Sequence, residues 1–286
     1  MKTSVSSYSF AQYVSSGKMT QFDCVSKAKE MGFDAIEFTN IITHDGEDAK
    51  TIAKKIRDEA DRVGIDINAY TISACLYQET DEDSEKEVAR LKEQLEIAKI
   101  LGAKVMRHDV CYKLGTSGNS RSFDLMLPTI AKNARMVTEY AETLGIKTCT
   151  ENHGFIAQDS YRVEKLFNSV AHDNYGLLVD VGNFLCADED PITAVSRVAP
   201  YAFHAHVKDF RFSKTPFDNG GLMTRGANYL IGCAIGEGIV PVKQCLAILK
   251  RAGYDGYISL EYEGTEDCML GISRGLENIK KYLSEI

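Results

Sequence analysis

Four acidic or imidazole side chains occur where apolar, strand-like runs of the sequence end. They are Glu151 after 146–150, Asp180 after 175–179, His206 within 201–210, and Glu261 after 254–260. Three carboxylates and one imidazole suit Mn²⁺, Mg²⁺, Co²⁺ or Fe²⁺ better than an ion that prefers thiolates. Without a cation, clustered carboxylates would repel one another and some would have to be protonated. The set therefore predicts one divalent metal site, with positions open for two oxygens of a sugar.

The run FHAHVKDF at 203–210 places three protonatable side chains on one face of a strand. His204, His206 and Lys208 alternate with other residues and point to the same side. His206 is the candidate metal ligand, and His204, one pleat deeper, is a candidate supporting or core group. Lys208, one pleat further out, would contact a substrate oxygen or pair with a carboxylate.

Further candidates surround these positions. His153 follows Glu151 by two residues, so an extended backbone would direct both side chains into the same space. An ordinary histidine pKa near ~6.5 suits a general base at neutral pH. Arg107 and His108 end another strand-like run and are candidates for substrate contact, with Tyr70 as a further candidate.

Eight strand-like runs alternate with helical patterns along the chain. Five helical patterns end in glycine directly before a strand, at positions 32, 64, 102, 145 and 253, where glycine would form a left-handed cap. Repeated strand–helix units predict a (βα)₈ TIM barrel, a single α/β domain over residues 1–286. An open doubly wound sheet is the alternative, but the sequence lacks the glycine-rich phosphate loop typical of such sheets. In a TIM barrel, the carboxyl ends of the strands form the active site.

One connection, roughly residues 211–239, is long and rich in glycine. A connection of this length in a compact domain is usually functional or forms a partner surface. We therefore expect it to shape the site or to bind a small partner subunit.

The composition argues against several classes of protein. The 286 residues carry a net charge of −8, which argues against a nucleic-acid partner, because surfaces that bind nucleic acid are basic. Eight cysteines without paired spacing indicate reduced thiols rather than a disulfide scaffold. The first residues lack the apolar segment of a secretion signal, and no apolar run approaches ~18 residues. We expect a cytoplasmic protein with no membrane contact.

Five motifs together resemble a known family. They are ENHG at 151–154, LVDVGN at 178–183, HAHVKD at 204–209, GEGIV at 236–240 and YDGYISLEYE at 254–263. The ordered set resembles the xylose isomerase-like TIM barrels of the sugar phosphate isomerase/epimerase superfamily, which includes tagatose 3-epimerase, inosose dehydratase and endonuclease IV relatives. The resemblance implies that Glu151, Asp180, His206 and Glu261 bind one divalent metal, often Mn²⁺, with Mg²⁺, Co²⁺, Fe²⁺ or Zn²⁺ as other possibilities. It also implies that Glu151 and Glu261 move protons on opposite faces of the substrate carbon.

Two positions depart from the epimerase pattern. The epimerases have histidine three residues after the aspartate at the end of strand six, where this sequence has Asn183. They also have arginine six residues after the strand-seven histidine, where this sequence has Phe212 next to Arg211. Asn183 and Arg211 are therefore the candidate substrate contacts at these places. Endonuclease IV relatives need more metal-binding histidines than these motifs supply.

The leading hypothesis is a divalent-metal-dependent isomerase or epimerase acting on a sugar or cyclitol, by proton abstraction next to a carbonyl and an enediolate. The alternative is a lyase or dehydratase on keto-sugars or inososes, including cleavage of 3-keto-glycosides or C-glycosides as one subunit of a complex. A second alternative is a non-catalytic sugar-binding or scaffold barrel. The expected partners are a small-molecule substrate and a second copy of the chain or a small subunit.

Overall fold

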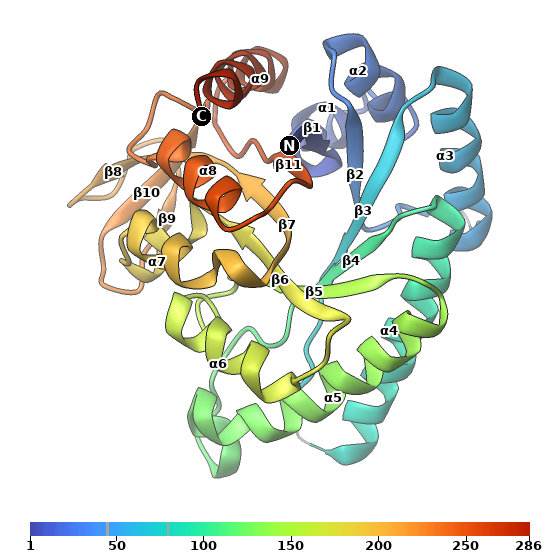
Figure 1. Cartoon of the computed structure of the whole chain (residues 1–286), viewed down its shortest axis with the longest axis vertical. Coiled ribbons are helices and arrows are strands. Elements are labelled where there is room, and N and C mark those ends of the chain that lie inside the picture. Colours follow the sequence, from blue (N-terminus) through green and yellow to red (C-terminus); the bar gives the residue numbers. More distant parts are fainter. Residues whose placement is uncertain (44–45, 79) are drawn as a thin grey trace.

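The computed structural model describes residues 1–43, 46–78 and 80–286, and its main element is a closed barrel of eight parallel strands (Figure 1). The barrel strands are β1 Lys2–Ser6, β2 Ala35–Thr39, β3 Asp66–Ile72, β4 Val105–His108, β5 Lys147–Glu151, β6 Tyr175–Asp180, β7 Ala202–Val207 and β11 Tyr257–Leu260. The strands pair in chain order, and β1 closes the barrel against β11. The predicted (βα)₈ architecture is confirmed.

The helices form a layer outside the barrel (Figure 1). The α-helices are α1 Ala11–Ser15, α2 Asp23–Met31, α3 Ala49–Val63, α4 Asp81–Leu101, α5 Phe123–Thr143, α6 Ser160–Val170, α7 Pro191–Val198, α8 Val242–Arg251 and α9 Cys268–Glu285. Short 3-10 helices are η1 Ser7–Phe10, η2 Gly118–Arg121, η3 Asn183–Ala187 and η4 Ala199–Tyr201. The apolar positions of α4 that recur at helical spacing are all buried: Val88, Leu91, Leu95, Ala98 and Leu101.

Glycine caps three of the helices that lead into the next strands, α2, α3 and α4. Gly32, Gly64 and Gly102 have φ of 85°, 71° and 79°, a left-handed conformation that other residues adopt at a cost. Helix α2 begins at Asp23. The Thr20 hydroxyl donates to the Asp23 carboxylate at 2.8 Å, so the threonine stabilises the start of the helix from outside it.

The long connection after β7 is a small sheet of its own, which the sequence reading missed. Strands β8 Asp209–Ser213, β10 Tyr229–Cys233 and β9 Leu222–Met223 pair in the antiparallel order β8-β10-β9. An isolated bridge joins Gly232 to Gly264, directly beyond the barrel strand β11. The sheet is therefore attached to the chain's own barrel, which weakens the hypothesis that this connection is a free docking surface for a small subunit.

Asp209, the last residue of the HAHVKD motif, fixes the end of this connection. Its carboxylate accepts hydrogen bonds from the backbone N–H groups of Gly236 and Gly238, both at 2.9 Å, and of Val240 at 3.0 Å. The motifs at 204–209 and 236–240 are thus two halves of one structural unit.

All eight cysteines are free thiols, and all but Cys75 are buried. Among the helices of the described residues, none combines the length and the apolar character needed to cross a membrane.

Candidate metal centre

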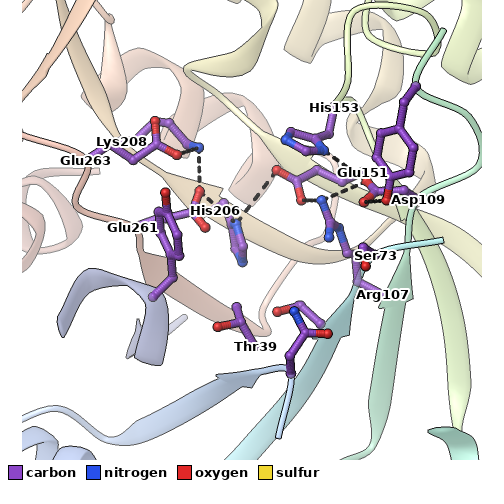
Figure 2. A pocket seen from close by; sticks show the side chains of 14 residues that line it. Thr39, Ser73, Arg107, Asp109, Glu151, His153, His206, Lys208, Glu261 and Glu263 are labelled. Atoms are coloured by element: carbon purple, nitrogen blue, oxygen red, sulfur yellow. Dashed lines mark hydrogen bonds and ion pairs between the residues drawn. The ribbon is translucent and has the colours of Figure 1, made fainter. Parts of the chain in front are cut away.

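The four predicted metal ligands meet at the carboxyl edge of the barrel. Glu151 and Asp180 end β5 and β6, His206 is next to last in β7, and Glu261 directly follows β11. Asp180 lies opposite His206 in the register of β6 and β7. One donor atom from each of the four residues lies within 4.8 Å of the others. The fold therefore places an imidazole and three carboxylates around one point. Figure 2 shows His206 between two of them, Glu151 and Glu261.

The donor atoms fit a divalent cation. His206 Nδ1 lies 3.9 Å from a Glu151 oxygen, 3.9 Å from Asp180 Oδ2 and 3.7 Å from a Glu261 oxygen. Within the described residues, His206 Nδ1 is buried and has no hydrogen-bond partner. Asp180 Oδ2 is also buried without a hydrogen bond, and lies 3.1 Å from Lys208 Nζ as an ion pair. Buried polar atoms are nearly always satisfied, so a buried His206 Nδ1 that has no hydrogen-bond partner and faces three carboxylates is the arrangement expected of a divalent metal site. The residues present fit the metal that the sequence resemblance implies.

The carboxylate of Asp180 is held by the backbone that follows it. Its Oδ1 accepts hydrogen bonds from the N–H groups of Gly182 at 2.8 Å and Asn183 at 2.9 Å. The Asn152 side chain bonds both to the carbonyl and to the N–H of Asp180, at 2.9 Å each. This leaves Oδ2 to face the centre. Burial raises the pKa of Asp180 to about 7, although Lys208 opposes the shift, so a cation at this point would stabilise the ionised carboxylate.

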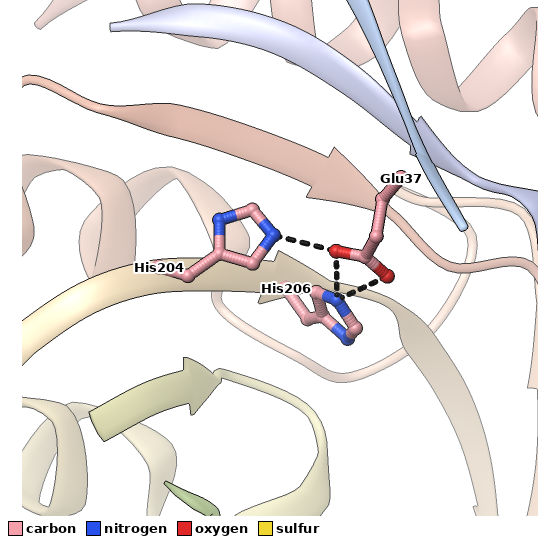
Figure 3. A group of neighbouring side chains, drawn as sticks. All are labelled: Glu37, His204 and His206. Carbon is pink, nitrogen blue, oxygen red and sulfur yellow. Dashed lines mark hydrogen bonds and ion pairs between the residues drawn. The ribbon is translucent and has the colours of Figure 1, made fainter. Parts of the chain in front are cut away.

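Glu37 on β2 holds both histidines of β7 (Figure 3). Its carboxylate accepts from His204 Nε2 at 2.5 Å and from His206 Nε2 at 2.8 and 2.9 Å. Burial alone would raise the pKa of Glu37, but the two imidazoles outweigh it and hold the pKa well below its usual range. Because Nε2 of His206 donates to Glu37, Nδ1 is the nitrogen that faces the carboxylates. A carboxylate behind a ligating histidine is a common way to orient the ring.

Sequence reasoning missed Glu37. The signal was a single acidic residue inside the otherwise apolar run AIEF at 35–38. An ionisable group in such a run requires a buried partner.

Lys208 is buried among the carboxylates on one side of the centre. Its Nζ lies 3.1 Å from Asp180 and 2.9 Å from Glu263, and it also pairs closely with Glu261. Burial alone would lower the pKa of Lys208, but Asp180 and Glu261 raise it well above the ordinary value. The sequence allowed two roles for Lys208, contact with a substrate oxygen or pairing with a carboxylate. In the structure it pairs with carboxylates.

Glu151 is held from two sides. Arg107 Nη2 lies 2.6 Å from one carboxylate oxygen, and Asn183 Nδ2 donates to the other at 2.8 Å. Asn183 is buried and does not line the pocket, so its position is that of a group that orients Glu151. Arg107 also lies 2.9 Å from Asp109 and reaches the pocket wall.

His153 lies at the mouth beside the same group of residues. Its Nδ1 is 3.0 Å from Asp109 Oδ1, and Asp109 also accepts from the Tyr112 hydroxyl at 3.0 Å. Burial alone would lower the pKa of His153, but the hydrogen bond to Asp109 raises it. His153 therefore faces the pocket as expected, with a carboxylate to hold its ring.

Besides Asn183, two further predicted substrate contacts lie away from the pocket, as does Tyr70. His108 is buried behind β4, with Nδ1 bonded to the carbonyl of Asp109 at 2.9 Å. Because strand neighbours point to opposite faces, Arg107 takes the inward position and His108 the outward one. Tyr70 likewise points outward and donates to Gln94 at 2.7 Å. Arg211 stands on β8 with its side chain about half exposed and pairs with Glu237 at 3.1 Å. The predictions that His108, Tyr70 and Arg211 contact the substrate are therefore corrected.

An open pocket of about 570 Å³ lies above the centre. Its lining is mainly polar: Tyr8, Thr39, Asn40, Thr71, Ser73, Arg107, Asp109, Tyr112, Glu151, His153, His206, Lys208, Glu261 and Glu263. A cavity of this size takes a small polar molecule, whose oxygens the lining could bind.

The sequence profile of a known family matches residues 25–282, and that family is described as the xylose isomerase-like TIM barrel. The chain belongs to this family. It is similar to the uncharacterized protein YihM of Escherichia coli K12, with 28% identity over 198 residues, covering 69% of this chain and 52% of YihM. It is also similar to inosose dehydratase of Clostridium beijerinckii, with 24% identity over 264 residues, covering 86% and 84% of the two chains. With several curated relatives, YihM among them, the match spans about half of the relative's length.

Solved structures of the xylose isomerase-like type share the barrel. The IOLI protein with a bound zinc atom has a TM-score of 0.76 at 16% identity, covering 100% of this chain and 99% of that one. An L-ribulose 3-epimerase has a TM-score of 0.76 at 14% identity, covering 99% and 95%. A barrel protein from Mycobacterium smegmatis in complex with magnesium has a TM-score of 0.68 at 19% identity, covering 92% and 88%. At these identities the likeness concerns the fold.

Proposed function

We propose that this chain is a divalent-metal-dependent isomerase or epimerase that removes a proton from a carbon next to the carbonyl of a sugar or cyclitol. The observation that carries the proposal is the convergence of His206 Nδ1 with three carboxylates at the base of an open polar pocket. Family membership and the epimerase and dehydratase among the similar proteins support the same class of chemistry.

The proposed ligands are Glu151, Asp180, His206 and Glu261, with Mn²⁺ as the preferred ion. When bound, such an ion supplies Lewis acidity that favours loss of a proton next to a carbonyl. The hard donor set also accepts Mg²⁺ or Zn²⁺, and these are the ions in two of the similar structures.

The proposed proton carriers are Glu151, Glu261 and His153. Glu151 is oriented by Arg107 and Asn183, so its carboxylate is fixed before a substrate enters. Glu261 belongs to the opposite side of the centre, where Lys208 pairs with it. His153 adds a third carrier at the mouth, held by Asp109. Two carboxylates on different strands can address two faces of one carbon, as epimerisation requires.

The pocket chemistry favours an uncharged substrate. Within the described lining, both permanent cations are already paired: Arg107 with Glu151 and Asp109, and Lys208 with three carboxylates. A phosphate group normally needs unpaired arginine or lysine donors. We therefore propose that the substrate is a neutral keto-sugar or inosose rather than a sugar phosphate.

Dehydration is the second candidate reaction. It begins with the same proton abstraction, and it is favoured by the inosose dehydratase whose match covers 86% of this chain. The two outcomes differ only in whether the carbanion regains a proton or loses a β-hydroxyl group.

The experiment is a screen of ketoses, inososes and 3-keto-glycosides with the Mn²⁺-loaded protein in D₂O. Deuterium at the carbon next to the carbonyl reports proton abstraction, and the product distinguishes an epimer from a dehydrated compound. Glu261→Gln should abolish uptake. Absence of deuterium in every substrate would contradict the proposal and favour a sugar-binding scaffold.

A further inference from the structure

A second cavity of about 360 Å³ adjoins the metal pocket. It lies between the small sheet of β8, β9 and β10 on one side and η1 and α1 on the other. Tyr8 and Glu263 line both cavities. The two cavities are therefore neighbours at these residues. We call this second cavity the side groove.

The side groove offers more apolar than polar surface, and Glu263 is the only charged side chain among the described residues that line it. Three of its polar side chains, those of Ser9, Gln12 and Glu263, are satisfied within the protein. Ser9 Oγ donates to the Leu260 carbonyl at 3.1 Å and accepts from Tyr262 N–H at 2.9 Å, and Glu263 accepts from Lys208 Nζ at 2.9 Å. The Gln12 amide donates to the carbonyls of Gly264 and Glu266 at 3.0 and 2.9 Å. Its apolar surface comes chiefly from Tyr8 and Leu222, which are partly exposed. The other apolar side chains that line it are buried: Phe210, Leu230, Ile231 and Tyr262. This lining contrasts with the metal pocket, whose walls are rich in charge.

Glycines keep the two walls of the side groove close together. A Cβ on Gly232 would lie 2.4 Å from the Glu263 carbonyl oxygen, and one on Gly264 would lie 2.3 Å from the Tyr262 hydroxyl. Gly232 and Gly264 are also joined by a bridge. The small sheet therefore cannot move away from the barrel without breaking close backbone contacts, and the side groove is preformed. A preformed cavity binds at a lower entropic cost.

We propose that the side groove is a subsite for an apolar, preferably aromatic, group attached to the sugar, so that the substrate is a glycoside rather than a free monosaccharide. This inference rests on the proposed function, because it takes the sugar ring to lie above the metal centre. The polar pocket matches the hydroxyl-rich ring, and the apolar groove matches the attached group. Tyr8 is about half exposed at the junction, where its ring can stack on the group that passes from one cavity into the other.

The test compares three probes by saturation-transfer NMR with Mg²⁺-loaded protein: methyl β-D-glucoside, 4-nitrophenyl β-D-glucoside and 4-nitrophenol alone. We expect the aryl glucoside to bind about tenfold more tightly than the methyl glucoside, because the aryl ring buries apolar surface. Leu222→Lys should remove this difference. Met223→Lys is the matched control, since Met223 neighbours Leu222 on β9, is largely exposed and does not line the side groove. Circular dichroism checks that both variants fold.

Each outcome decides a separate point. Equal affinity of the two glucosides, or an aryl preference that persists in Leu222→Lys, would overturn the subsite. Failure of 4-nitrophenol to bind would also overturn the subsite. This probe carries no sugar, so its binding does not depend on whether glucose is the sugar that the metal pocket accepts. Binding of the aryl probes that persists after chelation of the metal would support the subsite independently of the metal centre. The subsite then stands even when the deuterium screen defeats the proposed reaction.

Discussion

The Glu37 carboxylate and the His206 imidazole are joined through Nε2 at 2.8 and 2.9 Å, both groups fully buried. This contact links β2 to β7 across the barrel interior, and it settles which ring nitrogen faces Asp180 and Glu261. His206 thus presents Nδ1 in a fixed direction. Glu37 orients this proposed metal ligand and is not one of the four ligands itself.

Replacing Glu37 by Gln should weaken metal binding while the fold is kept. The amide has nearly the same shape but has no charge, so it supports the imidazole less well. Loss of a group that supports a ligand typically costs about 10- to 100-fold in metal affinity. Titration of the metal-free protein with Mn²⁺ by calorimetry measures the change. Glu47→Gln, at an exposed surface pair, should leave the affinity unchanged, and equal affinities for all three proteins would refute the role.

Replacing Glu261 by Gln should release the metal itself. Purified protein is expected to hold about one divalent ion per chain, since the four donors converge on one point. The amide side chain cannot supply a carboxylate, so the variant should retain far less metal after dialysis. Elemental analysis by mass spectrometry gives the stoichiometry. A variant with full metal content and unchanged turnover would defeat the ligand assignment.

The barrel and the convergence of the four ligands could be predicted from the sequence because both depend on local patterns. Glycine at position 102 marks a helix end, and a carboxylate after an apolar run, such as Glu151, marks a strand's carboxyl end. Parallel strands in a closed barrel bring such ends together without any further information. The five ordered motifs of the sequence also gave the distances along the chain between these strand ends.

The side-chain partners across the barrel could not be predicted in the same way. Glu37 and His206 are 169 residues apart in sequence. No pattern in the sequence near either residue identifies the other as its partner. His108 was misassigned because a strand end gives the level of a residue but not its face, and a one-residue shift exchanges the two faces. The small sheet was missed because only Lys208 separates β8 from β7, so the start of β8 reads as part of one strand over 201–210, and because β9 is only two residues long.

The buried thiols should make the protein less stable at alkaline pH. Burial raises the pKa of Cys24, Cys111 and Cys245 to about 12, whereas a thiol in the unfolded chain has a pKa of about 8.5. As the pH rises above that value, the unfolded chain loses protons that the folded chain keeps. The free energy of unfolding therefore falls as the pH increases from about 9 towards 12. At lower pH the thiols are protonated in both states, so they cause no change in stability with pH. Urea unfolding at pH 7, 9 and 10 measures the trend.

Thiol labelling provides the control for this prediction. At pH 8 an aromatic disulfide reagent should react first with Cys75, the only one of the eight cysteines that is not buried. A Cys75→Ser variant should lose that fast phase and keep the slow one. Several thiols reacting at the rate of unfolded protein would contradict the burial on which the pH dependence is based.

Replacing Lys208 by Met should destabilise the metal-free protein and spare the metal-bound one. The lysine is the cation nearest to Asp180, Glu261 and Glu263, and removing one partner of a buried ion cluster costs about 3–5 kcal/mol. A divalent ion supplies the lost positive charge, so Mn²⁺ should restore most of the stability. It should also bind the variant more tightly, because no ammonium group competes for the carboxylates. Urea unfolding with and without Mn²⁺ measures both effects.

Lys243→Met is the matched control, since Lys243 forms an exposed pair with Glu285 at 2.6 Å, and such surface pairs are worth only about 0–1 kcal/mol. It should lose little stability and show no added response to Mn²⁺. A loss in Lys208→Met that Mn²⁺ fails to reverse would indicate that the lysine supports packing alone. Unchanged stability without metal would mean that the three carboxylates do not depend on its charge. Either result would remove Lys208 from the electrostatic balance of the centre and leave Arg107, on the far side of Glu151, as the cation that holds the carboxylates together.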